Sequence, residues 1–184
     1  MNLDQLLDFN KKFVENKDYE VYATDKFPNK RMVIFTCMDT RLVELLPKAL
    51  NIHNGDVKMV KNAGAIIRKP FDSAVKSLLV AIYSLKAEEV VVIGHHGCGM
   101  TNVDTEELQQ SMVERGISEE TLHTLEHAGI NLHKEFHGFE KVEDSVSQSV
   151  GIIRNHPLLP KGIKVHGLVI DPETGKLDVV TRED

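Results

Sequence analysis

Two cysteines in this chain stand beside other residue types that bind metals. Cys37 begins the sequence Cys-x-Asp-x-Arg, which continues to Asp39 and Arg41, and Cys98 ends the sequence His-x-x-Cys, which begins at His95. Two thiolates and one imidazole suit zinc, and three protein ligands leave the fourth coordination position open. Since an open position is typical of catalytic zinc, the spacing predicts one Zn²⁺ per subunit, held by Cys37, His95 and Cys98.

The surroundings of the two cysteines fit a zinc site better than they fit a buried core or a redox pair. Free cysteine is often a buried apolar residue, but the neighbouring Asp39, Arg41 and His95 are poor core material. A redox pair is typically spaced Cys-x-x-Cys, and the sequence has no such spacing. Asp39 also has an ordinary structural interpretation, because an aspartate here can cap the helix that follows.

Short strand-like and helical patterns alternate along the chain and must position these side chains. Apolar residues recur at helical spacing in residues 72–86, whereas residues 90–93 form a continuous apolar run, typical of a strand covered on both faces. The order of the elements predicts an α/β fold: a short, mostly parallel sheet flanked by helices, with a C-terminal antiparallel hairpin as its edge strand. The predicted strands are 31–36, 57–61, 90–93, 163–170 and 177–180, and the predicted helices are 40–50, 72–86, 104–114, 118–128 and 142–154.

Length and composition set the broad class. The 184 residues are expected to form a single domain, 1–184, in which residues 1–28 are an N-terminal helical arm. The formal net charge of −6 disfavours nucleic acid as a partner, and the apolar runs are too short for a membrane partner. No secretory leader pattern is found at the N-terminus, so we expect a cytoplasmic protein, in which two cysteines do not form a disulfide framework.

Both metal-binding sequences directly follow predicted strands. Ligands of open α/β sheets bind outside the carboxyl ends of the strands. If the strands before Cys37 and His95 are neighbours, Cys37, His95 and Cys98 converge in one crevice. The glycines Gly94, Gly97 and Gly99 permit a tight path for the loop that holds two of the ligands.

At these residues the sequence resembles the β-class carbonic anhydrases, in particular their compact microbial branch. The similarity comprises Cys37-x-Asp39-x-Arg41, then Asn62-Ala63-Gly64, then His95-x-x-Cys98-Gly99-Met100, and extends from about residue 30 to 180. The resemblance implies a zinc lyase, a carbonate dehydratase, in which zinc-bound hydroxide reversibly hydrates CO₂ to bicarbonate and a proton. It also implies a homodimer, with a tetramer as an alternative, and a CO₂/bicarbonate substrate site.

The resemblance assigns roles to further residues. Asp39 and Arg41 are the catalytic dyad: the carboxylate orients the nucleophile by accepting its hydrogen bond, and the guanidinium holds the carboxylate. Without that hold Asp39 is a conditional fourth zinc ligand. Asn62, Gly64 and Gly97 are candidates for the substrate pocket, although Asn62 and Gly64 are equally suited to making a turn.

The chain departs from the family pattern at two positions beside the site. His96 stands where Ser or Thr is common, and Ala65 stands where Gly is frequent. His96 is a candidate proton shuttle because histidine as a residue type is suited to proton transfer near neutral pH, and a histidine hydrogen-bonded to the backbone is the alternative. His123, His127, His133 and His137 recur at four- to six-residue spacing. They suggest a solvated helix face, with a second metal site as the alternative.

Two alternatives to carbonic anhydrase stay open at this stage. A carbon disulfide or carbonyl sulfide hydrolase shares the zinc motif, and linear CS₂ suits the same attack geometry. A non-catalytic zinc-binding protein is the other, and the intact Asp39–Arg41 pair argues against it, since a structural site needs neither residue.

Overall fold

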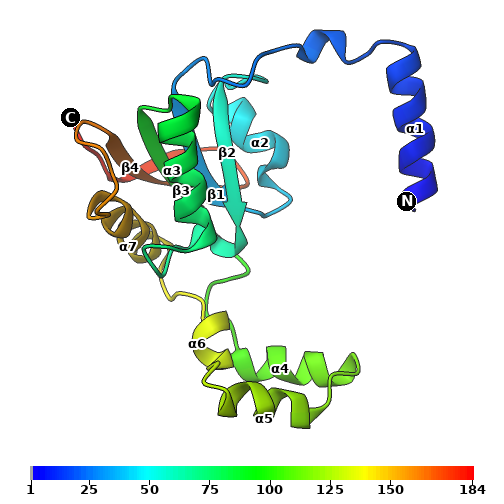
Figure 1. Ribbon diagram of the computed structural model, residues 1–184, viewed down its shortest axis with the longest axis vertical. Helices are drawn as coiled ribbons and strands as arrows, with labels where there is room; N and C mark the ends of the chain where they lie inside the picture. The colour runs from blue at the N-terminus through cyan, green and yellow to red at the C-terminus, as the bar shows by residue number, and fades with distance from the viewer. Residues whose placement is uncertain (1) are drawn as a thin grey trace.

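One five-stranded sheet organises the computed structural model, which describes residues 2–184. The strand order is β2-β1-β3-β4-β5, and all neighbouring strands are parallel except the antiparallel pair β4–β5 (Figure 1). The fold class predicted from the sequence is therefore confirmed. The strands are β1 (Met32–Cys37), β2 (Val57–Asn62), β3 (Glu89–His95), β4 (Lys164–Ile170) and β5 (Leu177–Thr181).

Alternating side chains of the central strands enter two separate cores. On one face, Val33 and Phe35 of β1 and Val90 and Val92 of β3 pack with two helices, α3 (Ser73–Leu85) and α7 (Val142–Arg154). On the other face, Ile34, Val91 and Ile93 pack with Leu42 and Leu46 of α2 (Leu42–Ala49). Because β3 is buried on both faces, its sequence is a continuous apolar run.

Helix α3 shows how local sequence sets an element's bounds. The side chain of Asp72 accepts a hydrogen bond from the Val75 N–H at 3.0 Å, which fixes the start of the helix. Lys86 adopts the left-handed conformation with φ of 61° and ends it. Asp104 plays the same capping role at the start of α4 (Thr105–Glu114), where it accepts from Glu106 and Glu107.

Two parts of the chain stand away from the sheet (Figure 1). Helix α1 (Leu3–Glu15) has no buried residue and is joined to β1 by a segment that contains the short helix Glu20–Tyr22. Helices α4, α5 (Glu119–His127) and α6 (Leu132–Phe136) form a helical excursion between β3 and α7. The sequence analysis did not predict α6. No helix in residues 2–184 is both long and apolar enough to cross a bilayer.

Candidate metal centre

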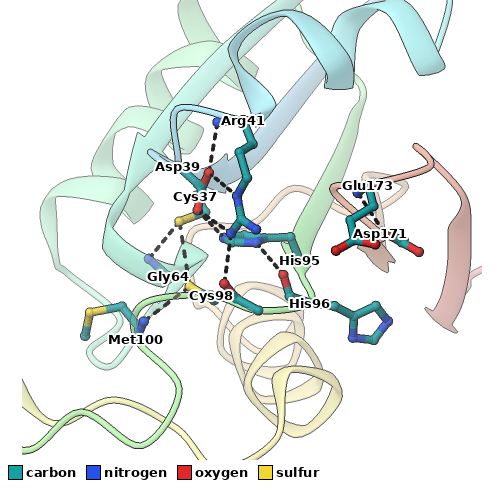
Figure 2. A network of polar contacts seen from close by, with 11 residues as sticks. Cys37, Asp39, Arg41, Gly64, His95, His96, Cys98, Met100, Asp171 and Glu173 are labelled. Carbon is teal, nitrogen blue, oxygen red and sulfur yellow. Dashed lines mark hydrogen bonds and ion pairs between the residues drawn. The ribbon is translucent and has the colours of Figure 1, made fainter.

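The ends of two neighbouring strands bring the predicted zinc ligands together. Cys37 is the last residue of β1 and His95 the last residue of β3, and these strands are paired in parallel. Cys98 follows on the tight loop after β3. All three side chains are buried, their ligand atoms lie within 4.8 Å of one another, and the two sulfur atoms are 3.9 Å apart (Figure 2).

This donor set fits a tetrahedral zinc ion. Two sulfurs bound at ~2.3 Å with tetrahedral angles lie about 3.8 Å apart, close to the spacing observed. The Nδ1–H of His95 donates to the His96 carbonyl at 2.9 Å, so the lone pair is on Nε2. That Nε2 atom is buried without a hydrogen-bond partner. A buried polar atom without a partner is costly, and a metal ion in the cluster would satisfy it.

Backbone amides surround the two sulfurs. Gly64 N–H donates to Cys37 Sγ at 3.3 Å, and Met100 N–H donates to Cys98 Sγ at 3.4 Å. The contact with Cys98 lowers the pKa of Cys37, and the same contact raises the pKa of Cys98. The two thiols are therefore coupled, and the ionised form is favoured at Cys37 and disfavoured at Cys98. A divalent ion would favour thiolates at both positions.

Asp39 and Arg41 form a bidentate pair at the mouth of the cluster. Arg41 donates from Nε to Asp39 Oδ1 at 2.9 Å and from a terminal nitrogen to Oδ2 at 2.8 Å. A further bond from Arg41 to the Gly97 carbonyl, at 2.8 Å, anchors the guanidinium. The guanidinium holds the pKa of Asp39 well below its usual range.

The carboxylate lies beside the cluster and outside it. Asp39 Oδ2 is 3.7 Å from His95 Nε2, but the described metal-ligating group contains only the two cysteines and the histidine. With Arg41 holding both of its oxygens, Asp39 is in the arrangement expected of a positioning carboxylate. The capping interpretation is wrong: Arg41 directly precedes α2 and no side chain caps the helix, while Asp39 Oδ1 accepts the Arg41 N–H at 2.9 Å in the turn before it.

The remaining predicted site residues lie in different surroundings. The Asn62 side chain bonds to both backbone groups of Ile66 and closes the turn at Ala63–Ala65, while Gly64 lines the metal pocket. His96 is exposed, and Figure 2 shows its ring pointing away from the sulfurs, on the side of Asp171. The Asn62 side chain therefore makes a turn, as one of its two interpretations predicted. The proton-shuttle role of His96 stays a prediction.

The histidines of the helical excursion lie in two pairs, and the ring centroids of His133 and His137 are 6.2 Å apart. His127 Nδ1 donates to the His123 carbonyl at 2.7 Å, and His133 contacts the hydroxyl of Thr105. Within residues 2–184, the cluster of Cys37, His95 and Cys98 is the one group of three metal-ligating side chains.

Sequence reasoning missed the part that Met100 plays. Met100 lines the metal pocket together with Met38, Thr40 and Ala63, and its amide bonds to a ligand sulfur. Its place directly after Cys98-Gly99 was a usable signal, because residues that follow a ligand on a tight loop stay close to the metal.

Comparison with known proteins agrees with this geometry. The family profile described as "Carbonic anhydrase" matches residues 32–177. "Putative carbonic anhydrase YtiB" of Bacillus subtilis (strain 168) is 52% identical over 178 residues, which are 97% of this chain and 95% of the relative. A "Carbon disulfide hydrolase" of Acidithiobacillus thiooxidans is 31% identical over 159 residues, which are 81% of this chain and 76% of the relative. The crystal structure of β-carbonic anhydrase isoform I from Trichomonas vaginalis has a TM-score of 0.87 at 32% identity and covers 99% of both chains. The chain belongs to the β-carbonic anhydrase family.

Proposed function

We propose that this protein is a zinc-dependent carbonic anhydrase that reversibly hydrates CO₂ to bicarbonate and a proton. The observation that supports this most is the bidentate Asp39–Arg41 pair set directly beside a buried group of two thiols and one imidazole. A purely structural zinc site needs a fourth ligand rather than a restrained carboxylate. Zinc bound by Cys37, His95 and Cys98 would supply a water more acidic than bulk water, a source of hydroxide.

The chain's own residues orient that water. Asp39 stays ionised and accepts a hydrogen bond from it, because Arg41 stabilises the carboxylate form. Arg41 binds both carboxylate oxygens, so the Asp39 side chain cannot rotate freely. The carboxylate is therefore already oriented before the reaction begins. The Gly97 carbonyl fixes Arg41 in turn, which gives this glycine a positioning role.

Metal analysis and kinetics together test the proposal. We expect purified protein to contain about one zinc ion per chain and to hydrate CO₂ in stopped-flow assays across pH 7–9. Protein that binds zinc in that ratio and leaves CO₂ hydration at the uncatalysed rate would contradict the carbonic anhydrase proposal and favour the non-catalytic zinc protein.

Hydrolysis of carbon disulfide or carbonyl sulfide is the second candidate. The observation that favours it is the 31% identity to a carbon disulfide hydrolase. Sulfide release from CS₂, measured on the same zinc-loaded sample, distinguishes the two activities. We expect CO₂ hydration to be the faster reaction, since the more similar relative bears the carbonic anhydrase name.

We further propose that two copies of this single-domain chain associate through the arm formed by residues 1–28. Leu3, Leu6 and Leu7 of α1 are 52–67% exposed, and the helix buries none of its residues within the chain. An isolated helix of this length is only marginally stable in water, so its apolar face needs a partner surface to pack against.

We also propose a cytoplasmic location. Cys37 and Cys98 are free thiols, which is the state that a reducing cytoplasm maintains.

The molar mass in solution tests whether two chains associate through the N-terminal arm. Light scattering after gel filtration is expected to give at least twice the chain mass for the unmodified protein. The double variant Leu3→Glu/Leu7→Glu is expected to shift toward the monomer, while Lys12→Glu, on the opposite, exposed face of the same helix, keeps the original mass. An unmodified protein that is monomeric at micromolar concentration would refute this association.

A further inference from the structure

Two hollows on the surface share one wall at the metal centre. The metal pocket, of about 560 Å³, is lined by Cys37, Asp39 and Cys98 among others. A second pocket, of about 590 Å³, lies between the sheet end and the helical excursion. Ala63, Gly99 and Met100 line both. Of these three residues, Met100 has the only long side chain, so it is the movable part of the shared wall.

The backbone of Met100 is held from both sides. Its N–H donates to Cys98 Sγ at 3.4 Å, and its carbonyl accepts from the Phe139 N–H at 3.1 Å. Asn102 N–H donates back to the Phe139 carbonyl at 2.8 Å, which ties the two ends of the helical excursion together. The backbone is thus restrained, and any opening between the pockets has to come from the methionine side chain.

That side chain lies against the backbone of the turn next to the first cysteine. A Cβ atom placed on Gly64 would come within 2.9 Å of Met100 Cγ and of Ile66 Cδ1. Gly64 itself donates to Cys37 Sγ. Figure 2 shows the Met100 amide turned toward Cys98 and the thioether extending away from both sulfurs. Met100 therefore covers the metal site without offering its sulfur as a ligand.

The lining of the second pocket suits a molecule without charge. Its apolar part is made by the side chains of Ala63, Ile66, Met100, Val103, Leu108 and Phe136. Its charged lining residues are Arg68, Lys69, Asp72 and Glu135. Lys69 is paired with Glu135 at 3.1 Å, the Asp72 carboxylate caps α3, and Arg68 is exposed to water. A neutral, apolar molecule gains from leaving water here, whereas the bicarbonate anion would have to shed its hydration.

We propose that this second pocket is the approach site for the neutral linear substrate, and that Met100 is the specificity-determining residue that limits the size of the molecule reaching the metal. The inference rests on the proposed function, because it assigns the choice among CO₂, COS and CS₂ to one side chain. Methionine is suited to the task, since its flexible thioether adapts to what passes it.

Substrate ratios test this assignment. In Met100→Ala, the ratio of kcat/KM for CS₂ to kcat/KM for CO₂ is expected to rise at least about tenfold, the discrimination that a few methylene groups commonly provide. Met100→Leu, of similar volume, and Met112→Ala, on α4 outside both pockets, are expected to keep the ratio within about threefold. An unchanged ratio in Met100→Ala with normal zinc content would overturn the assignment.

A measurement without turnover separates this inference from the proposed function. Xenon binds against apolar pocket linings, so crystals of the zinc-loaded protein under xenon pressure are expected to show the gas between Met100 and Leu108. In Met100→Ala the occupied volume is expected to extend toward Gly64. Absence of xenon from this pocket in both proteins would overturn the inference. Zinc-loaded protein that turns over neither CO₂ nor CS₂ would instead refute the proposed function, and xenon in the pocket would then still support the assignment of an apolar ligand.

Discussion

The two ends of the same strands place polar residues in opposite physical settings. At the carboxyl end, the side chains of Cys37 and His95 are 4% and 1% exposed, and Asp39 is held in a bidentate pair. At the amino end, Arg31 and Glu88 form an ion pair whose side chains are 61% and 60% exposed. Both ends bring charge together, but the Asp39 side chain is only 17% exposed and lies beside the buried His95, whereas both members of the pair at the amino end are open to water.

This difference determines what each end can do. Interactions between charges weaken in water, and exposed pairs contribute about 0–1 kcal/mol to stability. At the carboxyl end, the hydrogen bonds from Arg41 lower the pKa of Asp39, and the contact between the two sulfurs lowers the pKa of Cys37 and raises that of Cys98. The carboxyl end therefore holds the groups that the proposed function uses, whereas the exposed pair at the amino end contributes little to stability.

Removing the imidazole should produce the largest effect. In His95→Ala the cluster keeps two sulfurs but loses its nitrogen ligand, so we expect zinc content far below one per chain and CO₂ hydration at the uncatalysed rate. Thermal unfolding with and without added zinc measures the same loss, because a ligand stabilises only the state that binds it. Zinc binding equal to that of the unmodified protein would show that His95 is not a ligand.

Removing the charge of Asp39 should separate binding from catalysis. Asp39→Asn keeps the shape of the side chain but cannot form the charged pair with Arg41. Since Asp39 is outside the metal-ligating group, we expect zinc content to be unchanged and kcat for CO₂ to fall about 10²–10³-fold. Stopped-flow kinetics and metal analysis on one sample measure both quantities. Full activity with bound zinc would remove Asp39 from the mechanism.

The turn at Gly64, beside the metal cluster, should tolerate an added side chain less well than helix α7 does. Gly64 has φ of +77°, and an added Cβ would approach Ile66 and Met100 to 2.9 Å. We expect Gly64→Ala to lower the free energy of unfolding by about 1–3 kcal/mol in urea titrations. Gly151→Ala on α7 is the matched control, because no heavy atom lies within 4 Å of its added Cβ. Equal stability of the two variants would contradict the strain at Gly64.

The sequence was most informative where sheet geometry does the positioning. Cys37 and His95 each end a strand, and parallel neighbours bring their carboxyl ends to one edge, so their convergence could be predicted from strand positions. The catalytic roles of Asp39 and Arg41 remain predictions. The family resemblance named the same residues, and the structure adds the distances between them.

Some features depend on contacts that no local pattern contains. Helix α6 has five residues, too few for a helical period to be recognised. The bond between Met100 and Phe139 depends on how the helical excursion folds, because the whole of that excursion lies between the two positions in the sequence. The turn made by Asn62 had two equally good interpretations until its side chain was seen to bond to Ile66.

The amino end of the strands should respond to acid through the carboxylate of Asp56. In the loop before β2, Asp56 accepts the His53 N–H at 3.0 Å and lies 3.7 Å from Lys30 Nζ, and these contacts lower the pKa of Asp56. A carboxyl whose pKa is lower in the folded state stabilises the fold above its unfolded pKa of ~3.9. That contribution is lost as the pH falls through the lower, folded value. Urea titrations at pH 7, 5 and 3 should therefore show Asp56→Asn less stable than the unmodified protein at pH 7 and 5, with the difference shrinking toward pH 3. A difference that stays constant over this range would mean that the amide fails for its shape and not for its missing charge, and Asp56 would then be a turn residue with no electrostatic part.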